Sequence, residues 1–291
     1  MNGVINVYKS EGITSFDVVW KIRKLAHTKK VGHTGTLDPE ASGVLPICIG
    51  KSTKLVDYIM DGTKEYKALL RLGITTDTYD REGRILSEME VICDENQVIK
   101  VINSFIGDIK QIPPMYSALK VNGVRLYELA RKGIEVDRKE RSIHIYNIKI
   151  LKMDLPYVSM LIECSKGTYI RSLCYDIGNQ LGCGGAMWAL ERTRSGVFKK
   201  DEAVLLENLT ENNIEQHLTS MEEALSSFKS ISFNDDYKKY LLNGVPIDAS
   251  NVNDSLTKEE LYKVYLNSVG FLGIGMLEEK GFKMKKLLFQ E

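Results

Sequence analysis

The hydrophobic residues of the chain follow two periods, and each period predicts a different element. Residues 65–73 alternate, and one side of the alternation carries Tyr66, Ala68, Leu70 and Leu72. This spacing predicts a half-buried strand. Residues 15–26 and 170–181 instead repeat apolar side chains every three or four positions, which predicts amphipathic helices. We expect Ser15 to cap the first helix and Gly182 to end the second.

The C-terminal part of the chain has a different character. Residues 201–228 are acidic, and their apolar residues at helical spacing predict a helix; these are Met221, Leu225 and Phe228. Residues 230–291 contain short strand-like runs, which predict a small β-rich module. We therefore expect a mixed α/β (α+β) fold with two domains. Residues 1–229 would form a large, mainly antiparallel sheet with flanking helices, and residues 230–291 the small domain.

Composition narrows the class of protein. The chain has 291 residues, of which 43% are hydrophobic, and no apolar run approaches the roughly 18 residues that span a bilayer. Its first residues lack the pattern of a signal peptide, so we expect a cytoplasmic protein without membrane association. The five cysteines lack Cys-x-x-Cys spacing, and the four histidines lack i, i+4 spacing. We therefore predict neither disulfides nor a metal site.

Positive charge is concentrated in parts of the chain, although the formal net charge is zero. Residues 1–55 contain eight Lys or Arg against four acids, whereas residues 201–228 contain seven acids and no Lys or Arg. Such segregation can give a neutral molecule a basic face that meets phosphates. A second basic segment, residues 111–141, also contains aromatic residues and an Asn122-Gly123 turn signal. We predict that it forms a protruding arm.

One acid, Asp38, lies in the glycine-rich stretch GHTGTLDPEASGVLP. Gly32, Gly35 and Gly43 let a loop bring main-chain amides and this side chain close to a ligand. The stretch matches neither the phosphate-binding nor the dinucleotide-binding glycine pattern, which argues against nucleotide hydrolysis and hydride transfer. The residues alone leave open an ordinary surface loop in which Asp38 caps a helix that begins at Pro39.

A single carboxylate limits the chemistry of this loop. Glycoside hydrolysis needs a second carboxylate, and none lies nearby in the sequence, although Asp77 and Asp176 remain distant candidates. An aspartate with a reference pKa of about 3.9 is ionised at neutral pH, which suits nucleophilic attack. We therefore expect Asp38 to act without a partner acid.

Four blocks of sequence carry a resemblance to a known family. They are GHTGTLDPEASGVLPICIGKSTK, then KEYKALLRLG with TDTYDREG, then PPMYSALKVNGVRLYELARKG, then CSKGTYIRSLCYDIG followed by LGCGG. In this order the chain resembles the bacterial tRNA pseudouridine-55 synthase family of the TruB type over about residues 2–200. The resemblance implies a pseudouridine-synthase fold, a PUA-like RNA-binding tail and the isomerisation of a T-loop uridine. Asp38 matches the catalytic aspartate of the family.

The resemblance also assigns the other candidate site residues. Tyr66 matches the tyrosine that stacks on the flipped uracil, and Tyr169 and Arg171 match pocket residues, the arginine pairing with the catalytic carboxylate. Leu190 matches an apolar residue near the base, and His33 matches a histidine that helps to open the T-loop. From pattern alone, we would interpret Tyr66 as a core residue, Arg171 as a cation on the helix surface and His33 as an ordinary polar group. The match to the family motifs favours the functional roles instead.

The resemblance further implies how RNA is bound. The arm at residues 111–141 corresponds to an insertion that closes over RNA through Lys120, Arg125, Arg131 and Lys132. The tRNA T stem-loop is the expected partner, and we expect a monomer that needs no cofactor and no protein partner. Glu191 and Thr193 depart from the family pattern.

Two other function classes remain open at this point. One is a non-catalytic protein that binds or folds tRNA. The other is a carbohydrate-active enzyme that uses Asp38 with a remote acid.

Overall fold

A computed structural model describes residues 1–121, 123–252 and 256–289, and its main feature is one eleven-stranded sheet. Along this sheet the strand order is β14-β1-β3-β12-β4-β11-β10-β7, while β2, β13 and β15 pair at its side. The strands are β1 (Gly3–Lys9), β2 (Val31–His33), β3 (Ser42–Ile49), β4 (Lys64–Leu72), β7 (Gly107–Gln111), β10 (Arg141–Asp154), β11 (Tyr157–Cys164), β12 (Gly185–Ser195), β13 (Phe198–Lys199), β14 (Val204–Leu205) and β15 (Leu218–Thr219). Within the described part of this large sheet, only the β1–β14 and β3–β12 pairs are parallel. The expected mainly antiparallel sheet is therefore confirmed.

Six α-helices accompany the sheets in the described part of the chain. They are α1 (Ser15–Leu25), α2 (Val56–Met60), α3 (Glu95–Asn103), α4 (Leu126–Ala130), α5 (Ile170–Gln180) and α6 (Lys238–Asn243). Short 3-10 turns occur at Gly50–Leu55, Lys200–Glu202, Leu206–Asn208, Ile214–His217, Glu223–Leu225, Asp235–Tyr237 and Ala249–Asn251. None of the described helices is long and apolar enough to cross a membrane.

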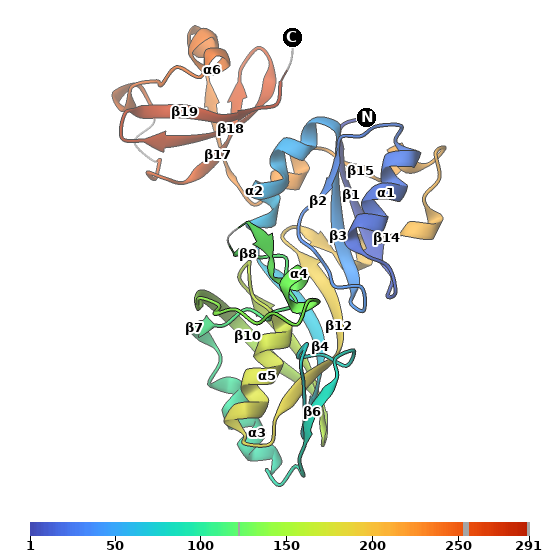
Figure 1. The fold of residues 1–291 in the computed structure, drawn as a ribbon. Coiled ribbons are helices and arrows are strands. Elements are labelled where there is room, and N and C mark those ends of the chain that lie inside the picture. The colour runs from blue at the N-terminus through green and yellow to red at the C-terminus, as the bar shows by residue number, and fades with distance from the viewer. Residues whose placement is uncertain (122, 253–255, 290–291) are drawn as a thin grey trace.

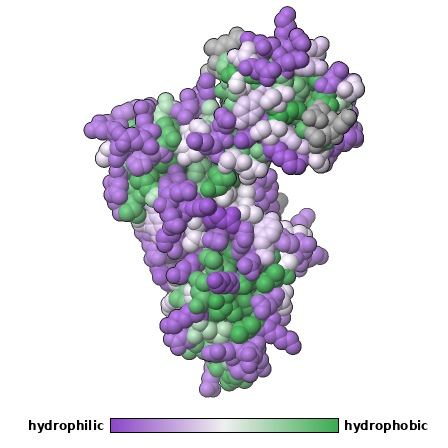
Figure 2. Space-filling view, turned by 180° about the vertical axis from the view of Figure 1, so that it is seen from behind, coloured by the Kyte–Doolittle hydropathy of each residue, from purple (hydrophilic) through white to green (hydrophobic). Residues whose placement is uncertain are grey.

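Helices α3 and α5 lie on one face of the lower part of the large sheet (Figure 1). The β4 side chains Tyr66 and Leu70 are buried in the core beneath them, as the alternating pattern predicts. The opposite face shows a broad hydrophobic surface in its lower half (Figure 2). Half-buried Leu69 and Leu161 come from the alternate positions of β4 and β11.

Two small hairpins project from the large sheet. The first pairs β5 (Ile74–Thr76) with β6 (Ile85–Glu88). The second pairs β8 (Lys120–Val121) with β9 (Val124–Arg125), and α4 follows it directly. In the predicted Asn122-Gly123 turn, Gly123 has a φ of +83°, and Asn122 lies outside the described residues.

Residues 229–287 form a second sheet with its own core. Its order is β16 (Lys229–Phe233), β17 (Leu261–Leu266), β18 (Gly270–Glu278) and β19 (Gly281–Leu287). Phe233, Tyr262 and Phe282 are buried together in this module. A separate apolar cluster joins it to the large sheet, because Ile274 and Leu288 pack with Val4, Leu55 and Ile59.

Two local predictions are wrong. The cap of α1 is Thr14, which accepts a hydrogen bond from the Asp17 amide, whereas Ser15 is already helical and buried. Residues 201–228 form 3-10 turns and the short strands β14 and β15 instead of a helix. Side chains there bond to the backbone: Asn213 accepts from the Thr210 amide and donates to the Asn208 carbonyl, which competes with helical hydrogen bonds.

Candidate active site

Asp38 and Arg171 form a two-point ion pair. The loop of residues 34–41 carries Asp38 between β2 and β3, and Arg171 lies at the start of α5. Arg171 Nε is 3.1 Å from Asp38 Oδ2, and Nη2 donates to Oδ1 at 3.2 Å. The arginine side chain is 8% exposed, whereas 38% of the aspartate side chain remains exposed. The carboxylate is therefore fixed in orientation and still open to a ligand.

A second acid completes this cluster, which corrects the expectation of an isolated Asp38. Asp80, in the turn after β5, lies 3.4 Å from Arg171 Nη1 through its Oδ2. The other two candidates serve elsewhere: Asp77 accepts a hydrogen bond from the Arg84 amide, and Asp176 has its pKa raised to about 6 by burial. Sequence reasoning assigns no role to Asp80, although the block TDTYDREG contains it, because only the fold brings this turn beside α5.

The charges around Asp38 act in opposite directions on its pKa. Burial raises the pKa of the Asp38 carboxyl, and the negative charge of Asp80 adds to the increase. Arg171 and Lys9 oppose it because positive charge favours the ionised carboxylate. The arginine therefore both orients the carboxylate and supports the form that can attack an electrophile.

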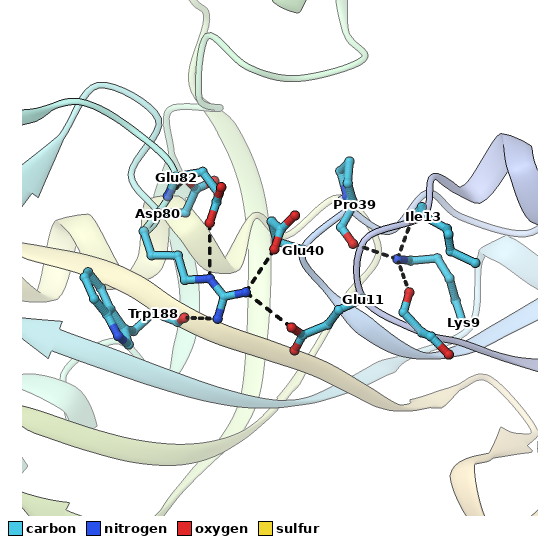
Figure 3. Close-up of polar contacts among 10 residues, drawn as sticks. Lys9, Glu11, Ile13, Pro39, Glu40, Asp80, Glu82 and Trp188 are labelled. Carbon is cyan, nitrogen blue, oxygen red and sulfur yellow. Dashed lines mark hydrogen bonds and ion pairs between the residues drawn. The ribbon is translucent and has the colours of Figure 1, made fainter.

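Lys9 holds the residue that follows Asp38. Its side chain is fully buried, and Nζ donates to the carbonyls of Ser10, Ile13 and Pro39 at 3.0, 2.8 and 3.0 Å (Figure 3). Burial lowers the pKa of Lys9 to about 8. All three ammonium donors are thus used to join the end of β1 to the loop of Asp38.

Arg81 holds the next residue of the same loop. Its Nη2 lies 2.9 Å from Glu40 Oε2 and 3.2 Å from Glu11 Oε2 (Figure 3). Its Nη1 also donates to the Trp188 carbonyl of β12 at 3.5 Å, and its Nε lies 3.3 Å from Glu82. Three consecutive loop residues, 38, 39 and 40, are therefore each held by a different cation.

Arg192 holds the backbone on both sides of Asp38. This side chain is 1% exposed, and it donates from Nε to the Val44 carbonyl at 2.7 Å and from Nη2 to the Gly35 carbonyl at 3.0 Å. A Cβ at Gly43 would lie 2.2 Å from the Arg192 carbonyl oxygen, and the φ of Gly43 is +112°. Glycine is therefore required where the first residues of β3 pair with β12.

The predicted aromatic residues lie close to Asp38. Tyr66 is 9% exposed, and Tyr169 is fixed at the start of α5 by Gln111, which accepts from the Tyr169 amide at 2.8 Å. Burial raises the pKa values of both phenols, and the charge of Asp38 contributes to each increase. Leu190, 8% exposed, lies in β12 on the strand next to Tyr66.

His33 is a partly buried residue of β2 near the start of the loop. Its Nδ1 accepts a hydrogen bond from the Gly35 amide at 3.3 Å. Burial lowers the His33 pKa, and the positive charge of Arg192 lowers it further. These contacts favour a neutral imidazole.

The four predicted basic residues of the arm are exposed, and the base of the arm is hydrogen-bonded to Arg171. The predicted set is Lys120, Arg125, Arg131 and Lys132. Tyr127 lies between two of them, with the guanidinium carbons of Arg125 and Arg131 5.8 and 5.5 Å from its ring centroid. At the base of the arm, the Tyr116 carbonyl accepts a 2.8 Å hydrogen bond from Arg171.

The two residues that depart from the family pattern make ordinary structural contacts. Glu191 accepts a hydrogen bond from Tyr8 at 2.7 Å and pairs with Lys200 at 2.6 Å. Thr193 donates to Glu65 at 2.7 Å. Among the residues that the structure describes, no group of three or more His, Cys, Asp or Glu is placed to hold a metal ion.

Comparison with known proteins identifies the family. Residues 23–170 match the TruB family pseudouridylate synthase N-terminal domain, and residues 171–228 match the tRNA pseudouridylate synthase B C-terminal domain. The tRNA pseudouridine synthase B of Clostridium acetobutylicum is 52% identical over 99% of this chain and 100% of its own length, and that of Clostridium tetani is 54% identical with the same coverage. A chain of the solved Cbf5-Nop10-Gar1 complex superposes with a TM-score of 0.77 at 28% identity, over 99% of this chain and 85% of that one. The chain belongs to the TruB family of pseudouridylate synthases.

Proposed function

We propose that this chain converts one uridine of the tRNA T-loop, at position 55, into pseudouridine. The relatives that span its full length are named tRNA pseudouridine synthase B, which supports tRNA as the substrate. The observation that carries the proposal is the partly exposed Asp38 carboxylate, held at both oxygens by the buried Arg171. A fixed, ionised and accessible carboxylate is the group that covalent isomerisation needs.

In the proposed reaction no atom is gained or lost. Asp38 attacks the nucleoside, either at the uracil ring or at the sugar C1′, and leaves again as a carboxylate. The bond between C1′ and N1 breaks, and a bond between C1′ and C5 forms. The C5 proton is released and N1 takes up a proton. Because no electrons are transferred to or from the nucleoside and no energy is consumed, we propose that no cofactor takes part.

The target base must leave the T-loop stack to reach Asp38. Extruding a base costs a few kcal/mol, and stacking on an aromatic side chain returns about 1–3 kcal/mol. We assign this stacking to Tyr66, with Tyr169 and Leu190 lining the remainder of the pocket. Neutral His33 is suited to fill the space that the base leaves, because it carries no charge that must be desolvated.

The remaining contacts would hold the folded T stem-loop. The exposed cations Lys120, Arg125, Arg131 and Lys132 are suited to phosphates. We propose that residues 1–229 form the catalytic domain and residues 230–291 a PUA-like RNA-binding domain. We further propose that the chain works as a monomer in the cytoplasm, without a protein partner.

Release of tritium from uridine C5 tests this function directly. A T stem-loop transcript labelled at C5 should lose tritium with the native chain, and a transcript with cytidine at position 55 should not. Asp38→Asn should abolish release while it still binds the transcript. Binding without release by the native chain would support the alternative of a tRNA-binding or tRNA-folding protein, and turnover that survives in Asp38→Asn would remove the nucleophile assignment.

A further inference from the structure

Helix α1 exposes two large aromatic side chains on one of its faces. Phe16 and Trp20 are four residues apart, so they lie on the same face, and they are 60% and 52% exposed. The opposite face of α1 is buried through Val18, Val19 and Ile22. The packing of the helix therefore does not account for either aromatic residue.

Basic side chains cover both rings. Lys24 Nζ lies 3.5 Å from the centroid of the Trp20 ring, and Arg23 Cζ lies 5.7 Å from that of Phe16. We call Phe16, Trp20, Arg23 and Lys24 the α1 stripe. Lys24 is exposed, so its charge stays available to an anion while it covers the Trp20 ring. Arg23 is partly buried and also donates to the Val31 carbonyl at 3.3 Å.

The α1 stripe is strongly positive. The segment that contains it and continues to the end of the turn after α1 has five Lys or Arg, none of which pairs with an acid in the described part of the chain; they are Lys21, Arg23, Lys24, Lys29 and Lys30. The one acid of α1, Asp17, is used by the Thr14 cap. Unpaired cations beside exposed rings suit a ligand with both phosphates and flat bases.

The α1 stripe begins beside the active site. Ser15 Oγ accepts from the Leu37 amide at 2.9 Å and donates to the Leu37 carbonyl at 3.0 Å, one residue before Asp38. At about 1.5 Å per residue, Trp20 lies roughly 8 Å farther along the helix. An RNA whose base reaches Asp38 can therefore extend to Trp20 through the nucleotides that adjoin that base.

We propose that the α1 stripe is a second RNA-binding site, which stacks an unpaired tRNA base on Trp20 and holds the adjoining phosphate on Lys24. The site is separate from the pocket of Asp38 and rests on the proposed function only in that tRNA is the ligand. Lys24 moves from the ring face to the phosphate when the base stacks. Hydrophobic contact alone would suit a protein partner instead, and the test separates the two.

The affinity of the full chain for an unmodified tRNA transcript should distinguish an aromatic contact from an apolar one. Trp20→Phe retains a ring and should bind within about twofold of the native chain, whereas Trp20→Leu and Trp20→Ala should bind about fivefold or more weakly, the lower end for one stacked base. Ile92→Ala is the matched control, because Ile92 is 87% exposed on another surface. Equal affinity of all four variants and the native chain, or equal affinity of Trp20→Leu and Trp20→Phe, would overturn the proposal.

Fluorescence gives an independent readout, because Trp20 and Trp188 are the two tryptophans of the chain. In a Trp188→Phe background, binding of tRNA should quench Trp20 emission, while heparin, an anion without bases, should not. Unchanged emission at saturating tRNA would contradict stacking. Saturating T stem-loop should still release tritium with Trp20→Ala, so failure of the α1 stripe and failure of the proposed function give different results.

Discussion

Asp38 and Asp80 share one guanidinium, with Arg171 Nε 3.1 Å from the first carboxylate and Nη1 3.4 Å from the second. The two acids are thereby kept on different edges of the same cation. Asp80 has no part in the proposed covalent chemistry, yet its charge raises the pKa of Asp38. Asp80 therefore holds Arg171 in place, while its charge opposes ionisation of Asp38, the proposed nucleophile.

Asp80→Asn should change rate and pH dependence separately. Removal of the Asp80 charge lowers the pKa of Asp38, so the ionised carboxylate persists to lower pH and the acid limb of the turnover profile should move to lower pH. At neutral pH the rate should fall about tenfold to a hundredfold, since Arg171 loses one of its supports. Single-turnover tritium release across pH measures both effects. Asp77→Asn, in the same turn, should leave the acid limb in place, and an upward shift in Asp80→Asn would contradict the electrostatic argument.

Arg81 and Glu40 should be exchangeable in part. Arg81→Glu places two negative side chains, at positions 40 and 81, next to each other. The turnover number should fall several-fold, because the loop loses its position. The KM for the T stem-loop should change little, because the loop keeps its ligand contacts. The double variant Arg81→Glu with Glu40→Arg should recover part of the loss. Glu11→Gln is the control, since it leaves the 2.9 Å contact between Arg81 and Glu40 intact. Additive losses in the double variant would show that the pair does not hold the loop.

Lys9 should give stability a characteristic dependence on pH. Its pKa is about 8 in the folded chain against 10.5 for an exposed lysine, so between these values the unfolded chain binds more protons. The contribution of Lys9 to the free energy of unfolding should therefore be complete above about pH 10.5 and be lost as the pH falls through about 8. Urea unfolding at about pH 7.5 and about pH 9.5 measures it.

The comparison for this experiment is Lys9→Met. The difference in unfolding free energy between the native chain and Lys9→Met should grow in favour of the native chain as the pH rises, because all other titrating groups are shared. A difference that stays constant would mean that Lys9 keeps an ordinary pKa. Turnover by Lys9→Met should also fall, since the Pro39 carbonyl loses its donor.

The arm should contribute charge and little else. Replacement of Lys120, Arg125 and Arg131 by Glu should weaken tRNA binding, and the slope of log affinity against log salt should flatten by about one for each lost phosphate contact. The circular dichroism spectrum should not change, because all three side chains are exposed. A slope equal to that of the native chain would exclude these residues from the RNA interface.

Sequence pattern predicts the parts of this fold in which burial repeats with a regular period. The strand β4 and the helices α1 and α5 are within one residue of their predicted bounds, because each buries one face. The same reasoning wrongly predicts a helix for residues 201–228. There, hydrogen bonds from side chains to the backbone and the pairing of β14 and β15 with β1 determine the structure instead.

The site divides in the same way. Motif resemblance locates Asp38 and Arg171, and the structure brings them into contact. The resemblance assigns no role to Lys9, Arg81 or Arg192, because each of these side chains acts through a contact between distant segments. A cation in sequence looks the same whether it faces solvent or holds a carbonyl, and only the fold separates the two.

The loop of residues 34–41 depends on cations from β1, from the turn after β5, from α5 and from β12. In a loop anchored in this way, the hydrogen-bonded amides of Thr34 and Leu37 should exchange with deuterium only when the surrounding sheet comes apart. A shortened chain that lacks any one of the four segments should therefore be inactive, because the loop would lose one of its anchors.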